Sequence, residues 1–269
     1  MKAPNASLVV ATYNVLATAY IRRARYPRTP ALVLDPAWRV PALAQHISVL
    51  EADILCLQEV DTEILSALRS RLGSRGHADR YARKNGGSPD GCATFCRQDV
   101  ARLMDEKVVR FADGGVGQSN TGNIALITIF DAFGHRLGII NTQLTWDPPG
   151  TARESQRGLR QARQLMLEYE NLAAAADAWI IAGDLNVTPD SEVVSLIEES
   201  GLRCVHAGRP TSNTGNFNGA AKKIDYLLHT PNLRSDPYEL CAIDAQTVLP
   251  SAEQPSDHVA VIARFDWKI

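Results

Sequence analysis

The chain has 269 residues, of which 45% are hydrophobic, so it can bury a large core in one domain or two. Its formal net charge of −2 and isoelectric point near 6.3 argue against a protein that coats nucleic acid through a generally basic surface. No apolar run reaches the length needed to cross a bilayer, so we expect a cytoplasmic protein without a membrane partner.

Short apolar runs that end in a polar side chain alternate along the chain with stretches of helical periodicity. The β-branched content and brevity of these runs favour strands. In chain order, the expected strands cover residues 8–13, 52–57, 92–96, 136–140, 178–182, 224–228 and 259–265. The expected helices cover residues 41–52, 63–72 and 152–176, and a fourth is capped by Ser191 and runs to residue 197. This mixture predicts one α/β layered domain over residues 1–269.

The polar residues at the strand ends are the first candidates for a functional site. Residues expected to be buried adjoin each of Asn14, Glu59, Asp184, Asp225 and Asp257. If the strand ends converge, four carboxylates share one cavity and repel one another. A hard divalent cation with oxygen ligands would relieve this repulsion, so we expect Mg²⁺, with Mn²⁺ as a substitute. The chain has no His/Cys cluster suited to zinc.

Two short motifs carry groups suited to phosphate chemistry. Asp184 and Asn186 lie two residues apart, and such positions point to the same side of an extended backbone. Asp184 can take a proton from water or orient it, while Asn186 can donate a hydrogen bond to developing charge. Taken alone, this run is equally typical of a turn. His258 follows Asp257, and a carboxylate beside a histidine can hold the imidazole charged and aimed at a phosphate oxygen.

Six motifs in order resemble the endonuclease/exonuclease/phosphatase superfamily, from about residue 8 to the C-terminus. They are Tyr13-Asn14, Gln58-Glu59, Asn141-Thr142-Gln143, Gly183-Asp184-Leu185-Asn186, Ile224-Asp225-Tyr226 and Ser256-Asp257-His258. The resemblance implies a four-layer α/β/β/α sandwich, with two packed mixed sheets flanked by helices, and Mg²⁺-dependent hydrolysis of phosphate esters. It also implies that Glu59 is the principal metal ligand, with Asn14 and Asp257 near the metal.

The same resemblance also assigns roles to the residues that would contact the attacking water and the phosphate. Asp184 would activate the attacking water, and Asn186 would steady that water or the scissile phosphate. His258 would contact the phosphate, with its imidazole oriented by Asp225. A metal between Glu59 and the phosphate would act as a Lewis acid, and the protein would supply position and charge stabilisation.

Finer features resemble the deadenylase and nocturnin branch of the superfamily, above all Trp146-Asp147-Pro148. This resemblance implies that Pro148, Asn186 and Phe217 line a purine pocket and that Trp146 lies at the substrate. Flat apolar faces beside a phosphate site suit base stacking. The alternative for Phe217 is an aromatic side chain that anchors its own loop.

Gln143 departs from the family pattern, which usually has His at this position. Glutamine can donate a hydrogen bond to a substrate phosphate, but it cannot carry charge or transfer a proton. The departure therefore concerns how Gln143 binds substrate, because the other motif residues are present.

We therefore expect a Mg²⁺-dependent phosphodiesterase that acts on nucleic acid, as a deadenylase-like 3′ exoribonuclease on RNA or short oligonucleotides. The substrate would be RNA rather than DNA, or a nucleotide, and no obligate protein partner is inferred. Three alternatives stay open: a phosphomonoesterase on a nucleotide or dinucleotide, a DNA endonuclease or exonuclease of the same superfamily, and a non-catalytic binding protein that keeps the fold.

Overall fold

Strands form the two central layers of the protein, in a computed structural model that describes residues 7–115, 117–206, 208–213 and 220–268. In chain order the strands are β1 (Ser7–Asn14), β2 (Ile54–Asp61), β3 (His77–Arg83), β4 (Asp90–Arg97), β5 (Ala101–Arg110), β6 (Ile124–Ala132), β7 (His135–Gln143), β8 (Ala178–Asp184), β9 (Arg203–Cys204), β10 (Asp225–His229), β11 (Leu233–Pro237) and β12 (Val261–Trp267). The α-helices are α1 (Ala31–Leu34), α2 (Pro36–Ser48), α3 (Thr62–Gly73), α4 (Arg157–Leu172) and α5 (Glu192–Glu199). Short 3-10 turns are η1 (Thr18–Tyr20), η2 (Arg23–Arg25), η3 (Arg153–Ser155) and η4 (Ala173–Ala175).

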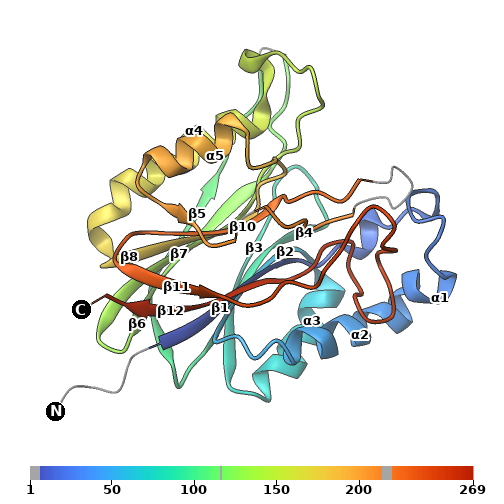
Figure 1. Cartoon of the computed structure of the whole chain (residues 1–269), viewed down its shortest axis with the longest axis horizontal. Helices are drawn as coiled ribbons and strands as arrows, with labels where there is room; N and C mark the ends of the chain where they lie inside the picture. Colours follow the sequence, from blue (N-terminus) through green and yellow to red (C-terminus); the bar gives the residue numbers. More distant parts are fainter. Residues whose placement is uncertain (1–6, 116, 207, 214–219, 269) are drawn as a thin grey trace.

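Two six-stranded mixed sheets pack against each other and are covered by helices on both outer faces (Figure 1). The first sheet has the strand order β11-β12-β1-β2-β4-β3, and the second has β5-β6-β7-β8-β10-β9. An apolar layer between the sheets includes Val10, Ile139 and Ile180. Helices α2 and α3 pack on the outer face of the first sheet, and α4 and α5 on that of the second. The expected four-layer sandwich is confirmed.

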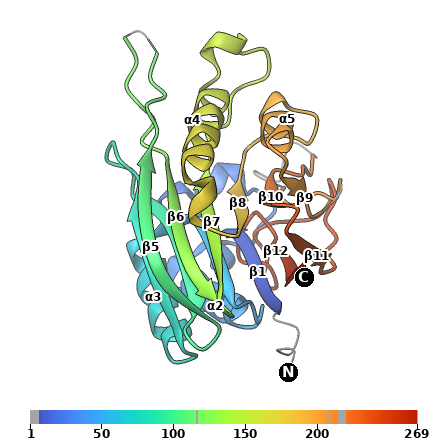
Figure 2. The same ribbon diagram turned by 90° about the vertical axis from the view of Figure 1, so that its left-hand side faces the viewer.

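Strand directions bring several polar ends to the same edge of the sandwich. β1 runs parallel to β2, β7 runs parallel to β8, and β10 is antiparallel to β8. Asp184 at the end of β8 is therefore in register with Gln143 at the end of β7 and with Asp225 at the start of β10. In the first sheet, Asn14 is in register with Gln58. Figure 2 shows β7, β8 and β10 of the second sheet in this arrangement.

The expected helices differ from the observed ones mainly at their ends. The prediction of a helix over residues 41–52 was wrong at both ends, because α2 already begins at Pro36 and ends at Ser48. Asp35 caps α2 by accepting a hydrogen bond from the Ala37 amide at 2.9 Å, and proline at the first helical position suits this start. α4 is shorter than the expected 152–176, because 3-10 turns replace its ends.

Several strands were absent from the expected set. β6 was missed although most of its residues are buried and apolar, while β5 lies at a sheet edge and carries many exposed charged side chains. An exposed edge strand has no clean alternation of apolar and polar residues for a pattern to detect. Within the described ranges, no helix has both the length and the apolar character that a membrane span requires.

Candidate active site

A cavity of about 670 Å³ opens at the edge of the sandwich where the polar strand ends meet. Its walls include four carboxylates, Glu59, Asp147, Asp184 and Asp257, and we call it the carboxylate cavity. His258 and Gln143 line it as well. The structure therefore brings together motifs that lie up to 199 positions apart in the sequence, counted from Glu59 to His258.

A bulge in β2 directs Glu59 into the carboxylate cavity. The register between β2 and β4 shifts between Leu57 and Val60, and Glu59 has a φ of 57°. A non-glycine residue in this left-handed region is uncommon and is often found at functional sites. Gln58 instead lies between the sheets, where its Nε2 donates to Asn141 Oδ1 at 2.8 Å. The bulge thus gives two consecutive polar residues different buried environments.

The ends of β1 and β8 use the same local turn. The Leu16 amide donates to Asn14 Oδ1 at 3.0 Å, and the Asn186 amide donates to Asp184 Oδ1 at 3.0 Å. Leu16 and Asn186 both have a φ of 55°. A polar side chain that bonds the backbone two residues later is an Asx turn, which stops the strand and holds that side chain in place.

Two side-chain amides hold Glu59 and Asp184 together. Asn14 Nδ2 donates to Glu59 Oε1 at 3.0 Å and to Asp184 Oδ2 at 2.9 Å. Gln143 Nε2 donates to the same two oxygens, at 2.7 Å and 3.2 Å. Burial alone would raise the pKa of Glu59, but the Lys84 ammonium and these amide hydrogen bonds lower it below its usual value.

His258 faces the carboxylates across the carboxylate cavity. Its Nδ1 lies 2.9 Å from Asp225 Oδ2, and Thr211 Oγ1 donates to the same oxygen at 2.6 Å. Its Nε2 lies 4.0 Å from Asp184 Oδ2 and 3.9 Å from Asp257 Oδ1, which is too far for a direct hydrogen bond. Burial alone would lower the pKa of His258, but the surrounding carboxylates, Asp225 first, raise it well above its usual value. His258 is therefore a charged donor with its Nε2 edge available to a ligand.

Two carboxylates of the carboxylate cavity have a pKa above the usual value of an aspartate. Burial raises the pKa of Asp184, and the charge of Asp225 raises it further, to about 7. Burial also raises the pKa of Asp257, whose Oδ2 accepts a hydrogen bond from the Tyr26 hydroxyl at 2.9 Å. A cation bound in this space would favour the ionised form of both.

The oxygen-rich donors of this space fit a hard divalent cation. Among the described residues, ligand atoms of Asp184, Asp225 and His258 lie within 4.8 Å of one another. Asp225 is fully buried and engaged with the imidazole, so it suits orientation of His258 better than metal binding. Glu59 and Asp257 line the same space, as does Asp147, whose two oxygens accept from the Arg157 and Gly158 amides. Mg²⁺ and Mn²⁺ prefer such ligands, whereas zinc sites in proteins are usually built from Cys and His.

The residues expected to contact substrate occupy different positions. Trp146 lines the carboxylate cavity with 55% of its surface exposed, and Asn186 lines it too, with its Nδ2 donating to Leu144 O at 2.8 Å. Pro148 is exposed, and its neighbour Pro149 is the proline that lines the cavity. Phe217 lies outside the described residues.

Lys84 is a residue at the carboxylate cavity that sequence reasoning missed. Its Nζ lies 2.6 Å from Gln143 Oε1 and 2.7 Å from Asp90 Oδ2, and the Tyr20 hydroxyl donates to Asp90 Oδ1 at 2.6 Å. Lys84 follows β3, in a glycine-rich loop, and lies 59 positions from Gln143 in the chain. No local pattern marks such a contact, although a lysine and an aspartate that flank one hairpin loop are a weak signal.

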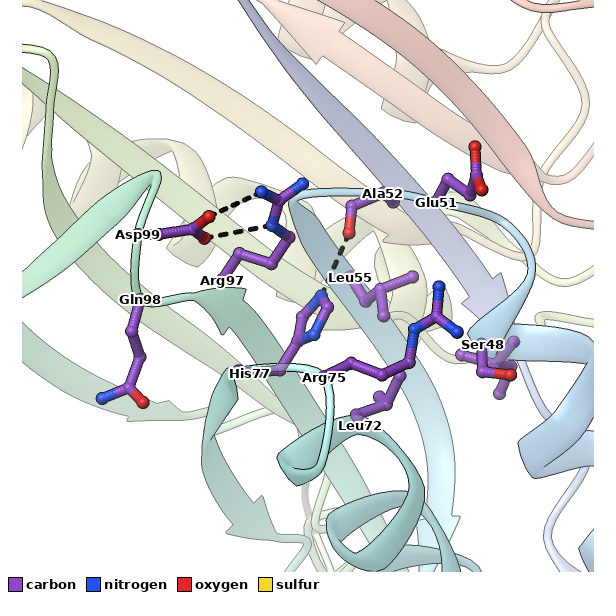
Figure 3. A pocket seen from close by; sticks show the side chains of 12 residues that line it. Ser48, Glu51, Ala52, Leu55, Leu72, Arg75, His77, Arg97, Gln98 and Asp99 are labelled. Carbon is purple, nitrogen blue, oxygen red and sulfur yellow. Dashed lines mark hydrogen bonds and ion pairs between the residues drawn. The ribbon is translucent and has the colours of Figure 1, made fainter.

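A larger cavity, of about 740 Å³, lies at the other end of the first sheet (Figure 3). It is lined where β2 and β3 begin and β4 ends, about 20 Å from Glu59 by the rise of a strand. Arg97 is paired with Asp99 at 2.7 Å, and His77 Nε2 lies 3.1 Å from Ala52 O. His77, Arg97 and Asp99 are thus engaged with protein groups, and the described residues that line this cavity include no cluster of carboxylates.

Known proteins resemble the chain in sequence over nearly its whole length. A profile of the Endonuclease/Exonuclease/phosphatase family matches residues 11–258. The chain is 24% identical to the CCR4-Not complex 3'-5'-exoribonuclease subunit Ccr4 of Debaryomyces hansenii, over 98% of the chain but 39% of that protein. It is 29% identical to protein angel homolog 2 of Mus musculus, over 93% of the chain and 47% of that protein. The chain thus spans less than half the length of these two relatives.

Solved structures share the fold. The crystal structure of ANGEL2, a 2',3'-cyclic phosphatase, has a TM-score of 0.84 and 20% identity, covering 98% of this chain and 96% of that one. The human nocturnin catalytic domain with bound sulfate has a TM-score of 0.72 and 21% identity, covering 97% and 94%.

Proposed function

The chain belongs to the Endonuclease/Exonuclease/phosphatase family, whose members hydrolyse phosphate esters, and we propose that it is a Mg²⁺-dependent phosphodiesterase acting at the 3′ end of RNA. One observation carries this proposal: Glu59 and Asp184, bridged by amides, face a charged His258 across one cavity. The Ccr4 relative, an exoribonuclease subunit by name, supports a 3′–5′ exoribonuclease activity.

The geometry suggests a role in the reaction for each of these side chains. Asp184 is the base that takes a proton from the attacking water, and its raised pKa suits proton transfer near neutral pH. His258 donates from Nε2 to a phosphate oxygen, while Asp225 holds the imidazole at Nδ1. Glu59 and Asp257 would hold the metal. A bound divalent cation supplies Lewis-acid stabilisation of the phosphate.

Asn14 and Asn186 act through the carboxylates in this proposal. The Nδ2 of Asn14 is engaged with Glu59 and Asp184, and its Oδ1 with the Leu16 amide. The Nδ2 of Asn186 lies 3.3 Å from Asp184 Oδ2. Both amides therefore fix the position of the base, and a phosphate that displaces a carboxylate oxygen would meet the same donors.

The walls of the carboxylate cavity support a nucleotide-sized ligand. A volume of about 670 Å³ lies within the range of small-molecule sites. Arg25 and Lys222 line it and offer positive charge to phosphate groups. The exposed Trp146 offers a flat face for base stacking, and Pro148 and Phe217 remain proposed neighbours of that base.

A second candidate is hydrolysis of a 2′,3′-cyclic phosphate at an RNA end. Angel homolog 2 of Mus musculus is 29% identical to this chain, and ANGEL2 is described as a 2',3'-cyclic phosphatase. The cyclic ester is also a phosphodiester, so the same base, donor and metal ligands would serve both reactions. The two candidate reactions differ only in which P–O bond of the RNA end lies at the base and the metal ligands.

A substrate panel separates the candidates. We expect turnover of poly(A) or mixed RNA, or of RNA with a 2′,3′-cyclic end, in Mg²⁺ but not in chelator. Preference for DNA, or release of phosphate from a nucleotide or dinucleotide, would replace the proposal with one of the other family activities. Activity on long RNA should fall steeply with salt, because a polyanion releases counterions on binding.

Isosteric variants test the residue roles. Glu59→Gln and Asp184→Asn remove charge with little change of shape, and each should lower kcat/KM by about 100-fold or more. Asp184→Asn should keep or raise the melting temperature, because burial and Asp225 oppose the Asp184 charge, whereas Glu59→Gln should lower it, because Lys84 and two amides stabilise the Glu59 carboxylate. Glu106→Gln on the exposed edge strand β5 is the matched control. Near-normal rates for Glu59→Gln in Mg²⁺ would contradict the proposal.

A further inference from the structure

The amide of Gln143 has only one orientation that satisfies its neighbours. Lys84 has donors and no acceptor, so the oxygen of the amide must face it, at 2.6 Å. The ionised carboxylate of Glu59 accepts only, so the nitrogen must face it, and Asp184 Oδ2 lies on the same side of the amide. The positions of oxygen and nitrogen in a glutamine amide are often ambiguous, but here the hydrogen-bond partners determine them.

Lys84 is a buried charge held by a small network. The residue is 8% exposed, and its Nζ contacts Asp90 at 2.7 Å, almost the same distance as its contact with Gln143. Asp90 is fully buried and is also bonded by the Tyr20 hydroxyl. Lys84 and Asp90 would neutralise each other without any contact to Gln143. The contact between Lys84 and Gln143 therefore needs its own explanation.

We propose that Lys84 is a positioning residue for the hydrolytic site, because its ammonium orients and polarises the Gln143 amide that bridges Glu59 and Asp184. Hydrogen bonds in a chain polarise one another, so a cation at Oε1 strengthens donation from Nε2. In this way Lys84, on the Oε1 side of the amide, supplies the positive charge that a glutamine lacks. The inference rests on the proposed hydrolase function of the same site.

The chain of contacts defines what Lys84 does and does not do. Its Nζ is separated from both carboxylates by the length of the Gln143 amide, so its hydrogen-bonded link to the site runs through that amide, its charge is felt by Glu59 at a distance, and it is not assigned to the reacting atoms. Loss of the Lys84 ammonium should leave Gln143 Oε1 without its donor, so the amide is held less firmly and donates less strongly to Glu59 and Asp184. The expected loss is therefore mainly in kcat rather than in KM.

A spectroscopic test reports the contact without any assay of activity. In ¹⁵N-labelled protein, the side-chain NH₂ of Gln143 is identified as the signal that disappears in Gln143→Met. We expect Lys84→Met to shift that signal and to speed its hydrogen exchange, and Lys107→Met on exposed β5 to leave it unchanged. An unmoved Gln143 signal in Lys84→Met would overturn the proposal, whatever the enzyme's substrate.

A double-mutant cycle tests the functional consequence. Lys84→Met should lower kcat by about 10- to 100-fold, in the range known for groups that orient metal-site residues. If Lys84 acts through Gln143, the double variant Lys84→Met/Gln143→Met should lose no more than Gln143→Met alone. Losses that multiply would overturn the proposal, as would full activity of Lys84→Met.

A companion variant separates positioning from folding. Lys84→Met leaves Asp90 as a buried unpaired carboxylate, so it is paired with Lys84→Met/Asp90→Asn, which removes that charge. We expect the companion to regain the melting temperature but not kcat. Recovery of kcat with stability would show that Lys84 only supports the fold. An inactive wild-type protein with an intact amide signal would contradict the hydrolase function and not the contact.

Discussion

Asp225 and His258 illustrate how one buried pair sets the charge of the site. The carboxylate contacts the imidazole at 2.9 Å and is the main group that holds the pKa of His258 above its usual value. A protonated His258 is the form that can donate to a phosphate oxygen. The rate should therefore fall as the pH rises through the raised pKa of His258.

Replacing Asp225 with Asn tests this link. The change removes the main group that raises the pKa of His258, so in Asp225→Asn the alkaline fall in kcat/KM should move to lower pH. The imidazole should titrate at lower pH by NMR as well. The amide of Asn keeps the shape of the side chain and an acceptor for the Thr211 hydroxyl, so the variant changes charge more than packing. An unchanged alkaline limb would show that His258 is not the group that titrates.

The same proton contributes to stability. His258 has a raised pKa in the folded state, so its contribution is fully present below the unfolded value of about 6.5 and is lost as the pH rises through the folded value. The difference in unfolding free energy between wild type and Asp225→Asn should narrow at high pH. Urea unfolding across pH measures this difference.

Motif residues were predictable from the sequence, but their connections were not. Asn14, Asp184 and His258 stand at the ends of apolar runs, where polarity is conspicuous. The bulge at Glu59 and the amide bridges depend on backbone geometry and on contacts between distant strands, such as the 170 positions between Asn14 and Asp184. Lys84 has only a weak local signal, the nearby Asp90, because its partner Gln143 lies on the other sheet.

At the scale of elements, the close approach of β7 and β8 determines where Asp184 lies. A Cβ added to Gly183 would come within 1.9 Å of the Thr142 carbonyl oxygen on the neighbouring strand. Backbone atoms cannot yield as a flexible side chain can, so β8 would have to shift. The residue directly before the proposed base is therefore glycine for steric reasons.

Gly183→Ala should destabilise the protein by about 1–3 kcal/mol, as overpacking of a core does, and should lower kcat by displacing Asp184. Urea unfolding and single-substrate kinetics measure the two effects. Gly73→Ala is the matched control, because a methyl group there meets nothing within 4 Å. Equal stability of the two variants would refute the steric argument.

Helix starts were predicted correctly where one capping residue was clear and were misplaced where two starts were possible. Ser191 caps α5 as expected, through a hydrogen bond from the Val194 amide at 3.3 Å. The start of α2 was misplaced because Pro41 looked like a first helical residue, whereas Asp35 and Pro36 provide the actual start. The sequence has two prolines at which this helix could begin. The packing of Val40 and Leu43 on the first sheet requires the helix to begin at the earlier one, Pro36.

At the scale of the whole molecule, the site exists only when the two sheets are packed together. Asn14 and Glu59 come from the first sheet, and Gln143, Asp184 and Asp225 from the second. The layered fold was predictable from the resemblance of the motifs to a family, since periodicity alone gave only an α/β class. The cavity between the sheets could not be inferred without their relative placement.

Carboxylates from both sheets meet in the carboxylate cavity, and from this we predict that stability depends on a divalent cation. The folded protein gathers acidic groups that the unfolded chain disperses, so a cation should bind the folded state preferentially. At a hundredfold excess over Kd, such binding stabilises by about 2.7 kcal/mol. We therefore expect Mg²⁺ or Mn²⁺ to raise the melting temperature by roughly 5–10 °C relative to chelator.

Variants decide whether this stabilisation comes from the carboxylate cavity. Glu59→Gln should reduce the Mg²⁺-dependent shift in melting temperature, whereas Glu106→Gln, which removes an exposed charge on β5, should retain it in full. Sodium chloride at matched ionic strength controls for general screening, which acts on surface charges without filling the cavity. An equal shift in Glu59→Gln and wild type would place the cation elsewhere, and Glu59 would then lose its proposed role as a metal ligand while the shared fold stands.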